Sequence, residues 1–584
     1  MARLSQARGM TRLVRWLWIA AICSSSLLAT ARPEDTFAFS AEAIEAAARA
    51  EAVDNRDLGN IVLPENDTFY TAPSGFEKTA PGTILRSRPV PNPLTINNKD
   101  AINVKGAWQI QYRTQNSVGE PEAAVMTVLE PYNAKKNSLL VYHYFTDSSY
   151  GGCAPSIALQ VGNRQDNTYV QLQSLIVVAA LSQGWYVSVA DDGGPQAAFG
   201  SGLQAAYATL DSIRAVKQSG NITGLNPDPI TTMYGYSGGA LTGSWTTEMH
   251  PLYAPELKIH GAALGGNIPN ITALVRTFNK GDRASFGPPI ILGMSHDYKN
   301  LSDWLKENVI PGQEAALRKA DYQCFDSNEA YARTELGIYF KRTYQSLMDD
   351  PVPQSVFYWG GVQGLRAVPK VPWYLYETIW DDASPVELTD RLVEKYCAAG
   401  HSIYYERNHQ KLNHSEECIA GLPGAFAWLR DRHNGIPITL GCKTVQVDQP
   451  FWGALTDKGG LLLRGLLDGF LAYLGLPVGP GLSLTAPKLK PAPAVSAVPA
   501  AAPKAPSAQG TLPSLPKAAT GQRPAPKATA PKAVAPKAIA PKAAASKAAA
   551  PKGTVAKGAT APKTPKAPKG VGFSFDGDGL DVYE

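Results

Sequence analysis

Short apolar runs alternate with amphipathic stretches through the middle of the chain. The runs are about four to eight residues long and rich in β-branched and aromatic side chains, which favours buried strands. Between two of them, Leu210, Ile213 and Val216 recur at the spacing of one helix face, and residues 239–250 favour a second helix. The predicted strands are 138–145, 184–190, 231–234, 257–264, 372–379 and 402–406.

Strands that alternate with helices predict an α/β fold, in which a mostly parallel sheet carries helices on both faces. In such a sheet, the side chains that bind or react with a ligand lie at the carboxyl ends of the strands. The segments that follow the predicted strands are therefore where we expect the candidate chemistry.

The first part of the chain has the composition of a secretory signal. Residues 1–31 begin with a basic stretch, continue with an apolar run over 17–28 and end on the small-residue site Ala29-Thr30-Ala31. A membrane anchor is the alternative, but three serines interrupt the run and it is short for a span. We expect cleavage after residue 31, a secreted protein, and no transmembrane segment once the signal is removed.

A second change of composition separates a body, residues 32–476, from a tail. Residues 477–571 consist largely of Ala, Pro and Lys, and an A-P-K-A-x unit recurs from Lys527 to Lys557. Such a segment has almost nothing to bury, so we expect a disordered, extended chain. A short acidic terminus, 572–584, follows; its Asp-rich stretch 576–581 lacks further calcium ligands, and we predict no metal.

The overall net charge of +5 hides an acidic body joined to a basic tail. The body carries a formal charge of roughly −10, and the tail has many lysines and no acidic residue. We interpret the tail as a solvated spacer; adhesion to an anionic surface, such as a cell wall or lipid headgroups, is the alternative. Nucleic-acid binding is disfavoured, because no aromatic residues are interleaved with the basic ones.

Cysteine usage agrees with secretion. Of the six cysteines, Cys23 lies in the predicted signal, which leaves an odd set in an oxidising compartment. Two bridges and one free thiol is the simplest arrangement of Cys153, Cys324, Cys397, Cys418 and Cys442. Sequons compatible with a eukaryotic secreted glycoprotein occur at Asn66, Asn221, Asn270, Asn300 and Asn413.

The pentapeptide Gly235–Gly239 has the form G-x-S-x-G and lies between a predicted strand and a predicted helix. On a tight turn of this kind, small flanking residues let a serine hydroxyl stand exposed, here that of Ser237. A serine is a poor nucleophile unless an imidazole takes its proton and a carboxylate orients the imidazole. The pentapeptide alone is common, so its partners decide whether it is functional.

The expected chain order is serine, then acid, then histidine. Asp381 and Asp382 follow the predicted strand 372–379, and His414 follows the strand 402–406 at the start of a helix predicted to run through Leu429. Two alternatives stay open on spacing alone. Asp382 could cap a turn with Ser384 and Pro385, and His409 competes with His414.

Several segments together resemble the secretory lipase family of α/β-hydrolases. The similarity spans roughly Pro64 to Pro480, with the motifs in the family's order. The matching segments are Tyr144–Asp147, Cys153–Ser156, Asp191–Pro195 with Ala198-Phe199, Leu210–Ala215, Gly235–Ala240 and Ile379–Asp382 with Pro385.

The resemblance implies roles for particular residues. Ser237 is the expected nucleophile, Asp381 the triad acid and His414 the general base, while backbone N–H groups of Asp147 and Gly238 form the oxyanion hole. No cofactor is implied. It also implies bridges Cys153–Cys324 and Cys397–Cys442 with Cys418 unpaired, and a helical cap inserted at about 267–358. A glycan at Asn413 would crowd the base, so we expect Asn413 to be unmodified.

The expected function is hydrolysis of carboxylic esters by a secreted serine hydrolase, with triacylglycerol as the substrate that the resemblance favours. One alternative is a short-chain carboxylesterase that acts on esters of a secondary metabolite or polysaccharide. Another is a catalytically inert surface-adhesion protein held by its lysine-rich tail.

Overall fold

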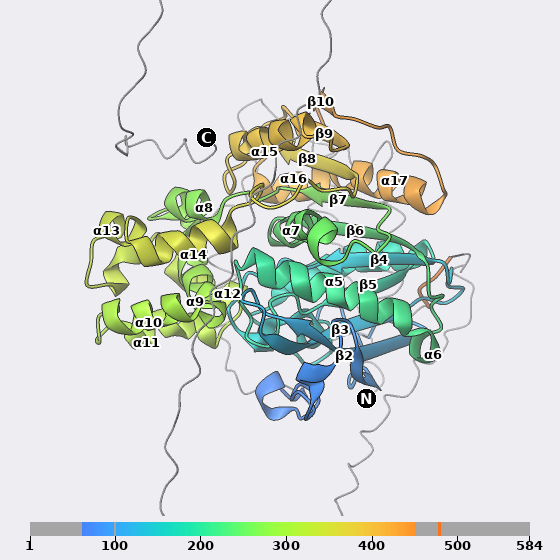
Figure 1. Ribbon diagram of the computed structural model, residues 1–584, viewed down its shortest axis with the longest axis horizontal. Helices are drawn as coiled ribbons and strands as arrows, with labels where there is room; N and C mark the ends of the chain where they lie inside the picture. The colour runs from blue at the N-terminus through green and yellow to red at the C-terminus, as the bar shows by residue number, and fades with distance from the viewer. Residues whose placement is uncertain (1–60, 99–100, 450–476, 481–584) are drawn as a thin grey trace, which may run out of the picture. The chain divides into compact units, whose positions relative to one another are not determined.

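The computed structural model describes residues 61–98, 101–449 and 477–480, and its centre is one twisted sheet (Figure 1). Among these residues the strands follow the order β1-β2-β3-β5-β4-β6-β7-β8-β9-β10. The pairs β1–β2, β2–β3 and β3–β5 are antiparallel and all the others are parallel. The predicted α/β fold with a mostly parallel sheet is confirmed. The signal segment, the acidic terminus and nearly all of the tail lie outside the described residues.

The strands have these bounds: β1 Ile84–Pro89, β2 Gly106–Gln115, β3 Pro121–Glu130, β4 Ser138–His143, β5 Tyr186–Ala190, β6 Ile230–Tyr236, β7 Gly261–Gly265, β8 Trp373–Thr378, β9 Ile403–Asn408 and β10 Lys443–Val447. The helices before β7 are η1 Pro64–Asn66, η2 Phe76–Lys78, η3 Gly151–Cys153, α3 Pro155–Ala158, α4 Thr168–Ser182, α5 Gly202–Gln218, α6 Gly220–Thr223 and α7 Gly238–Tyr253. Those after β8 are α15 Val386–Ala398, α16 His414–Ala420 and α17 Leu422–His433.

Side chains of the central strands alternate between two hydrophobic cores, one on each face of the sheet. In β4, Leu139 and Val141 enter the core shared with α5 and α7, whereas Leu140 and Tyr142 enter the core shared with α4 and α17. This alternation follows from the two-residue period of a strand. Because both faces are covered, these strands are mostly apolar on both faces, which explains why their sequence signal is a run rather than an alternation.

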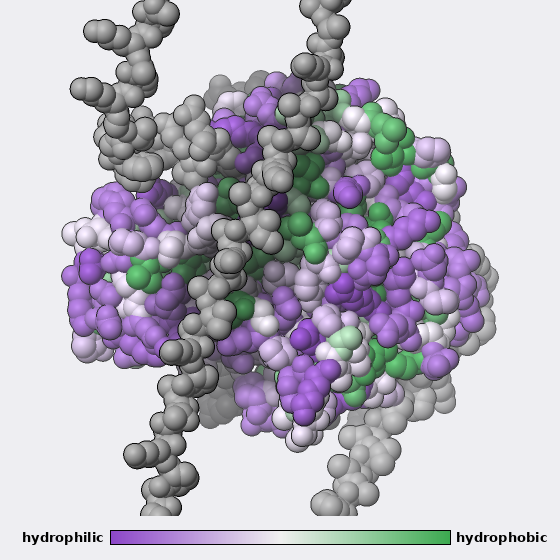
Figure 2. All heavy atoms as spheres, viewed as in Figure 1, coloured by the Kyte–Doolittle hydropathy of each residue, from purple (hydrophilic) through white to green (hydrophobic). Residues whose placement is uncertain are grey.

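The segment between β7 and β8, residues 266–372, contains no strand and is here named the cap segment. Its elements are α8 Ile271–Phe278, η4 Asp282–Phe286, α9 Gly287–Asp297, α10 Lys299–Asn308, α11 Glu314–Leu317, η5 Arg318–Asp321, α12 Phe325–Asn328, η6 Glu329–Tyr331, η7 Leu336–Tyr339, α13 Tyr344–Met348 and α14 Pro351–Gly361. They gather on one side of the sheet, where Figure 2 shows a mostly hydrophilic outer surface.

Several predicted boundaries differ from those of the structure, and three of these differences have a clear physical reason. The strand predicted at 257–264 begins only at Gly261, because the carbonyl of Leu257 accepts a hydrogen bond from the His250 ring rather than joining the sheet. The helix predicted from His414 onward divides at Gly421, just before Pro423, which lacks a backbone donor. The tail was predicted to begin at 477, yet Val478 is buried and its carbonyl accepts from Tyr132.

Two disulfides occur in the described part of the chain. Cys153 pairs with Cys324 across a sequence separation of 171 residues, and Cys397 pairs with Cys442 across 45. Cys418 is free and buried. This is the pairing that the family resemblance implies. The first bridge ties the segment after β4 to the cap segment, and the second ties α15 to the residue before β10. Among the described residues, every helix is too short or too polar to span a bilayer.

Candidate active site

Ser237 stands on the turn from β6 into α7, and its backbone adopts φ 54° and ψ −122°. A side chain on either flanking glycine would not fit: a Cβ on Gly235 would lie 2.2 Å from the carbonyl oxygen of Gly239, and one on Gly239 equally close to that of His143. The backbone N–H of Ser237 donates to Gly265 of the neighbouring strand at 2.9 Å. The turn therefore has the strained, crowded geometry that exposes a nucleophile.

Asp381 and His414 come from neighbouring strand ends and are paired. The Nδ1 atom of His414 lies 2.7 Å from Oδ2 of Asp381, whose carboxylate is fully buried. The other oxygen of Asp381 accepts the backbone N–H groups of Ala383 and Ser384 at 2.8 and 2.7 Å. Because the carboxylate accepts, Nδ1 carries the proton and Nε2 of His414 is left as an acceptor.

The imidazole of His414 lies against the residues that surround Ser237. A Cβ on Gly266 would lie 2.7 Å from Cε1 of His414, and the ring centroids of Tyr236 and His414 are 5.1 Å apart. Nε2 of His414 is buried and has no hydrogen-bond partner among the described residues. It does not bond to the Ser237 hydroxyl. Catalytic hydrogen bonds of this kind are often long without substrate and tighten in the complex.

Asp147 follows β4 and lies over the first residue of α7. Its backbone has φ 48°, and its Oδ1 lies 2.7 Å from the place where a Cβ on Gly238 would stand. Burial raises the pKa of the Asp147 carboxyl to about 7, against the opposing influence of the positive charge on Arg283. A side chain larger than hydrogen at 238 would thus displace Asp147.

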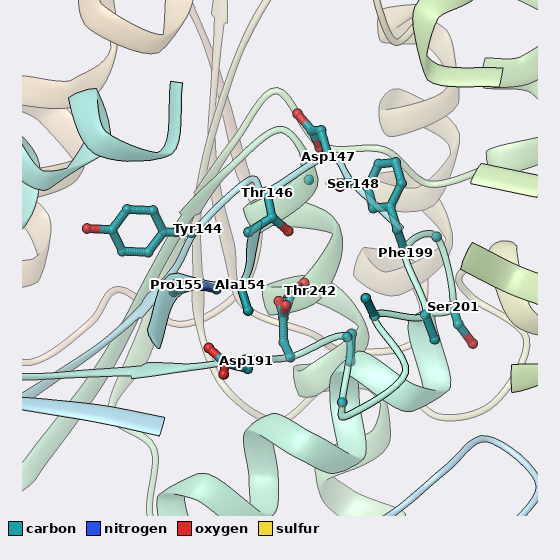
Figure 3. A pocket seen from close by; sticks show the side chains of 18 of the residues that line it. Tyr144, Thr146, Asp147, Ser148, Ala154, Pro155, Asp191, Phe199, Ser201 and Thr242 are labelled. Carbon is teal, nitrogen blue, oxygen red and sulfur yellow. Dashed lines mark hydrogen bonds between the residues drawn. The ribbon is translucent and has the colours of Figure 1, made fainter. Parts of the chain in front are cut away.

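A pocket begins at Asp147 and Gly238 and extends beneath the loop that follows β5. Figure 3 shows Thr146, Asp147 and Ser148 on one side of it and Asp191 and Thr242 on the other. Asp191 accepts hydrogen bonds from the backbone and the hydroxyl of Ser156, and burial raises its pKa to about 7. Residues 191–194 of the family-like segment therefore line one wall of this pocket.

The structure does not place His409 or Asp382 in the roles that spacing alone left open for them. His409 is exposed, and its Nε2 bonds to Gln446 of β10, away from the turn of Ser237. Asp382 does not cap the following turn; Asp381 does so. Partial burial alone would raise the pKa of Asp382, but Arg283 and the backbone N–H of His414 hold it below its usual value.

Asn413 caps the helix that His414 begins. Its side-chain oxygen accepts from the N–H of Glu416, whose carboxylate accepts the N–H of Asn413 in return. This capping box fixes the first turn of α16 and with it the direction of the imidazole. Sequence reasoning noted Asn413 only as a sequon.

Sequence reasoning also missed three residues around the site. The Tyr236 hydroxyl donates to the carbonyl of His414, and Arg283 of the cap segment pairs with Asp382. Glu377, buried on β8, accepts the N–H of Asn267, and burial together with the charge of Asp381 raises its pKa well above its usual value. Tyr236 lay within the quoted motif; the other two belong to no motif, so only the tertiary contacts identify them. Within the described ranges, no three His, Cys, Asp or Glu side chains could together hold a metal ion.

The sheet order, the serine on its turn and the paired acid and histidine at successive strand ends define an α/β-hydrolase. A family model described as secretory lipase matches residues 159–441. Lipase A of Arthroderma benhamiae is 36% identical over 429 residues, which cover 72% of this chain and 90% of that protein. The chain therefore belongs to the secretory lipase family, a family of ester hydrolases.

Two further comparisons, one of sequence and one of structure, also match this chain to ester hydrolases. The trichothecene C-3 esterase of Fusarium sporotrichioides is 34% identical over 384 residues, which cover 63% of this chain and 83% of that protein. The crystal structure of Candida antarctica lipase A in its closed state superposes with a TM-score of 0.63 at 26% identity, over 72% of this chain and 99% of that chain.

Proposed function

We propose that the protein is a serine hydrolase that cleaves carboxylic esters through an acyl-enzyme. Ser237 attacks the ester carbonyl carbon while Nε2 of His414 takes the hydroxyl proton, and the imidazolium then returns that proton to the leaving alcohol. Asp381 holds the tautomer and stabilises the charged ring. Water, deprotonated by the same imidazole, attacks the acyl-enzyme and releases the carboxylic acid together with the free Ser237.

One observation carries this proposal: Nδ1 of His414 lies 2.7 Å from the Asp381 carboxylate, Nε2 has no partner among the described residues, and Cε1 between them lies against Gly266, next to the turn of Ser237. Unpartnered buried ring nitrogens also occur in His143, His401 and His433, but of these histidines His414 alone bonds its other ring nitrogen to a carboxylate. A general base needs such a nitrogen, because it must receive a proton during the reaction.

The backbone N–H groups of Gly238 and Asp147 are the proposed donors to the oxyanion. Gly238 is the residue after the nucleophile, and Asp147 packs directly over it. Removing one such donor typically costs about 3–4 kcal/mol of barrier height. A Cβ at 238 would lie 2.7 Å from Oδ1 of Asp147 and displace that side chain, so the glycine at 238 supports the assignment.

For the substrate we propose triacylglycerol or another fatty-acyl ester. The support is membership of the secretory lipase family and the similarity to proteins named as lipases. The second candidate is a carboxylesterase for short acyl groups, which the similarity to a protein named as a trichothecene C-3 esterase favours. A long acyl group gains about 0.8 kcal/mol for each buried CH₂, so the two candidates differ sharply in chain-length dependence.

The test compares the parent with Ser237→Ala and with Ser355→Ala, an exposed serine of α14 that serves as control. In Ser237→Ala, fluorophosphonate labelling should vanish and kcat for p-nitrophenyl esters should fall by about 10⁶-fold. Both labelling and hydrolysis should remain in Ser355→Ala. Labelling that persists in Ser237→Ala would refute the nucleophile. A chain-length series and emulsified long-chain triglyceride decide the substrate, since activity confined to acetyl esters excludes the lipase.

We also propose that the protein is secreted after cleavage behind Ala31, as the family description implies for its members. N-terminal sequencing of the protein from culture medium tests the cleavage site. Removal of residues 481–584 leaves the packed Val478 in place and tests the tail. Unchanged hydrolysis and unchanged binding to anionic vesicles support a spacer, while lost binding supports adhesion.

A further inference from the structure

One side chain of the cap segment, Arg283, contacts the loop that carries the proposed triad acid. Its Nε and Nη2 atoms donate to the carboxylate of Asp382 at 3.1, 2.9 and 2.9 Å. The Oδ1 atom of Asp382 also accepts the backbone N–H of His414 at 2.9 Å. A single carboxylate therefore joins η4 of the cap segment to the first residue of α16.

The charge of the same guanidinium also acts on the loop after β4. Its positive charge counteracts the effect of burial on the pKa of Asp147, the proposed oxyanion residue after β4. Arg283 thus acts electrostatically on the loop after β4 and by hydrogen bonds on the loop after β8.

The backbone that carries Arg283 is firmly held. Phe286, three residues on, packs against Phe278 and Phe325 with ring centroids 5.3 and 5.1 Å apart. Ser285 donates to the carboxylate of Glu329 at 3.1 Å. A planar guanidinium on a fixed backbone imposes one geometry on the carboxylate that it binds.

We propose that Arg283 is a positioning residue for ester hydrolysis, which acts through Asp382 to fix the backbone at His414. The inference rests on the proposed function of His414. Hydrolysis then requires the cap segment to be seated against the Asp381–Asp382 loop. The side chains of Arg283 and Asp382 are 23% and 52% exposed, so solvent screens the pair and its contribution to global stability is modest. A small displacement of a catalytic base, by contrast, strongly lowers the rate.

The experiment therefore looks for a loss of rate without a matching loss of stability. In Arg283→Gln we expect kcat to fall about 10- to 100-fold, with KM within about threefold of the parent. Arg283→Lys keeps the positive charge but not the forked guanidinium, and its kcat should lie between that of the parent and that of Arg283→Gln. Arg333→Gln is the matched control. Arg333 pairs with Asp282 of the same η4 at 2.6 Å, and this exposed pair does not involve Asp381 or Asp382. The kcat of Arg333→Gln should equal that of the parent.

A double-mutant cycle tests the route through Asp382. If Arg283 acts through this carboxylate, Arg283→Gln combined with Asp382→Asn loses no more rate than the larger single loss. Parental kcat in Arg283→Gln, an equal fall in Arg333→Gln, or fully additive losses would each overturn the inference. Should Arg283→Gln fail to fold, Arg283→Lys and Asp382→Asn supply the comparison. A parent without hydrolysis or Ser237 labelling would instead refute the proposed function.

Discussion

The sheet scaffold and the cap segment are held together in different ways. In the scaffold, successive side chains of β4, β6 and β8 enter two separate cores, and long helices cover both. The cap segment consists of short helices with a hydrophilic outer surface (Figure 2). It is tied to the scaffold by the covalent Cys153–Cys324 bridge and by polar contacts that include the Arg283–Asp382 pair and the hydrogen bonds of Glu248.

This difference separates two properties that the site needs. The turn of Ser237 and the loops of Asp381 and His414 inherit their spacing from strand pairing, which cannot change without disrupting the sheet. The cap segment shares the apolar core on the α5 and α7 face, for example through Ile290 and Met294, and it is also tied to the scaffold by polar contacts and one disulfide, each of which can be removed singly. We therefore expect changes in the scaffold loops to affect chemistry, and changes in the ties to affect stability or positioning.

The largest effect should come from the scaffold. Asp381→Asn removes the carboxylate that fixes the tautomer of His414, and kcat should fall by about 10⁴-fold while the fold is retained. Asp382→Asn, one residue away, should cost far less because it contacts only the backbone of His414 and the cap. Single-turnover kinetics on an activated ester measure both. Equal losses at the two positions would contradict the comparison.

Removing the covalent tie should have the next largest effect. The Cys153→Ser, Cys324→Ser double variant opens a loop that the disulfide closes across a sequence separation of 171 residues. The gain in entropy of the unfolded chain predicts a loss of about 5 kcal/mol in the free energy of unfolding. The Cys397→Ser, Cys442→Ser variant, with a separation of 45, should lose about 4 kcal/mol. Denaturant unfolding ranks the two, and the reverse order would refute the entropic account.

Asp191 should make scaffold stability depend on pH. Burial raises its pKa to about 7 in the folded protein, so its contribution is fully present below pH 4 and is lost as the pH rises through about 7. The parent should therefore lose about 3 kcal/mol relative to Asp191→Asn between pH 4.5 and pH 8. Denaturant unfolding across this range measures the difference. The exposed Asp282→Asn serves as control, and a parallel shift for both variants would contradict the assignment.

The smallest effect should follow from loosening a polar tie of the cap. Glu248, buried on α7, accepts the backbone N–H groups of Gly364 and Arg366 at 2.7 and 2.9 Å. Glu248→Gln weakens both bonds and removes the negative charge near the Arg366 guanidinium, so unfolding should become easier by about 2 kcal/mol. Glu256→Gln, at an exposed ion pair, is the control and should change stability by less than about 0.5 kcal/mol. Equal losses would show that burial of Glu248 is unimportant.

The central strands were predictable because their pattern reflects burial on both faces, which any doubly covered sheet imposes on its residues. The turn of Ser237 was predictable for a related reason: Gly235 and Gly239 have no space for a Cβ, so the local sequence itself records the geometry. The helical break at Gly421 was not foreseen, although a Cβ there would lie 2.0 Å from Cδ2 of Tyr376, because that contact crosses from α16 to β8.

The sequence by itself determined the α/β architecture, the candidate nucleophile and the chain order of its partners, since these depend on local backbone geometry and periodic burial. Only the tertiary structure decided that His414 rather than His409 faces Asp381, and that Asp382 is bound by Arg283 from 99 residues away. Such pairings depend on the distances between strand ends after folding. No local pattern of residues carries that information.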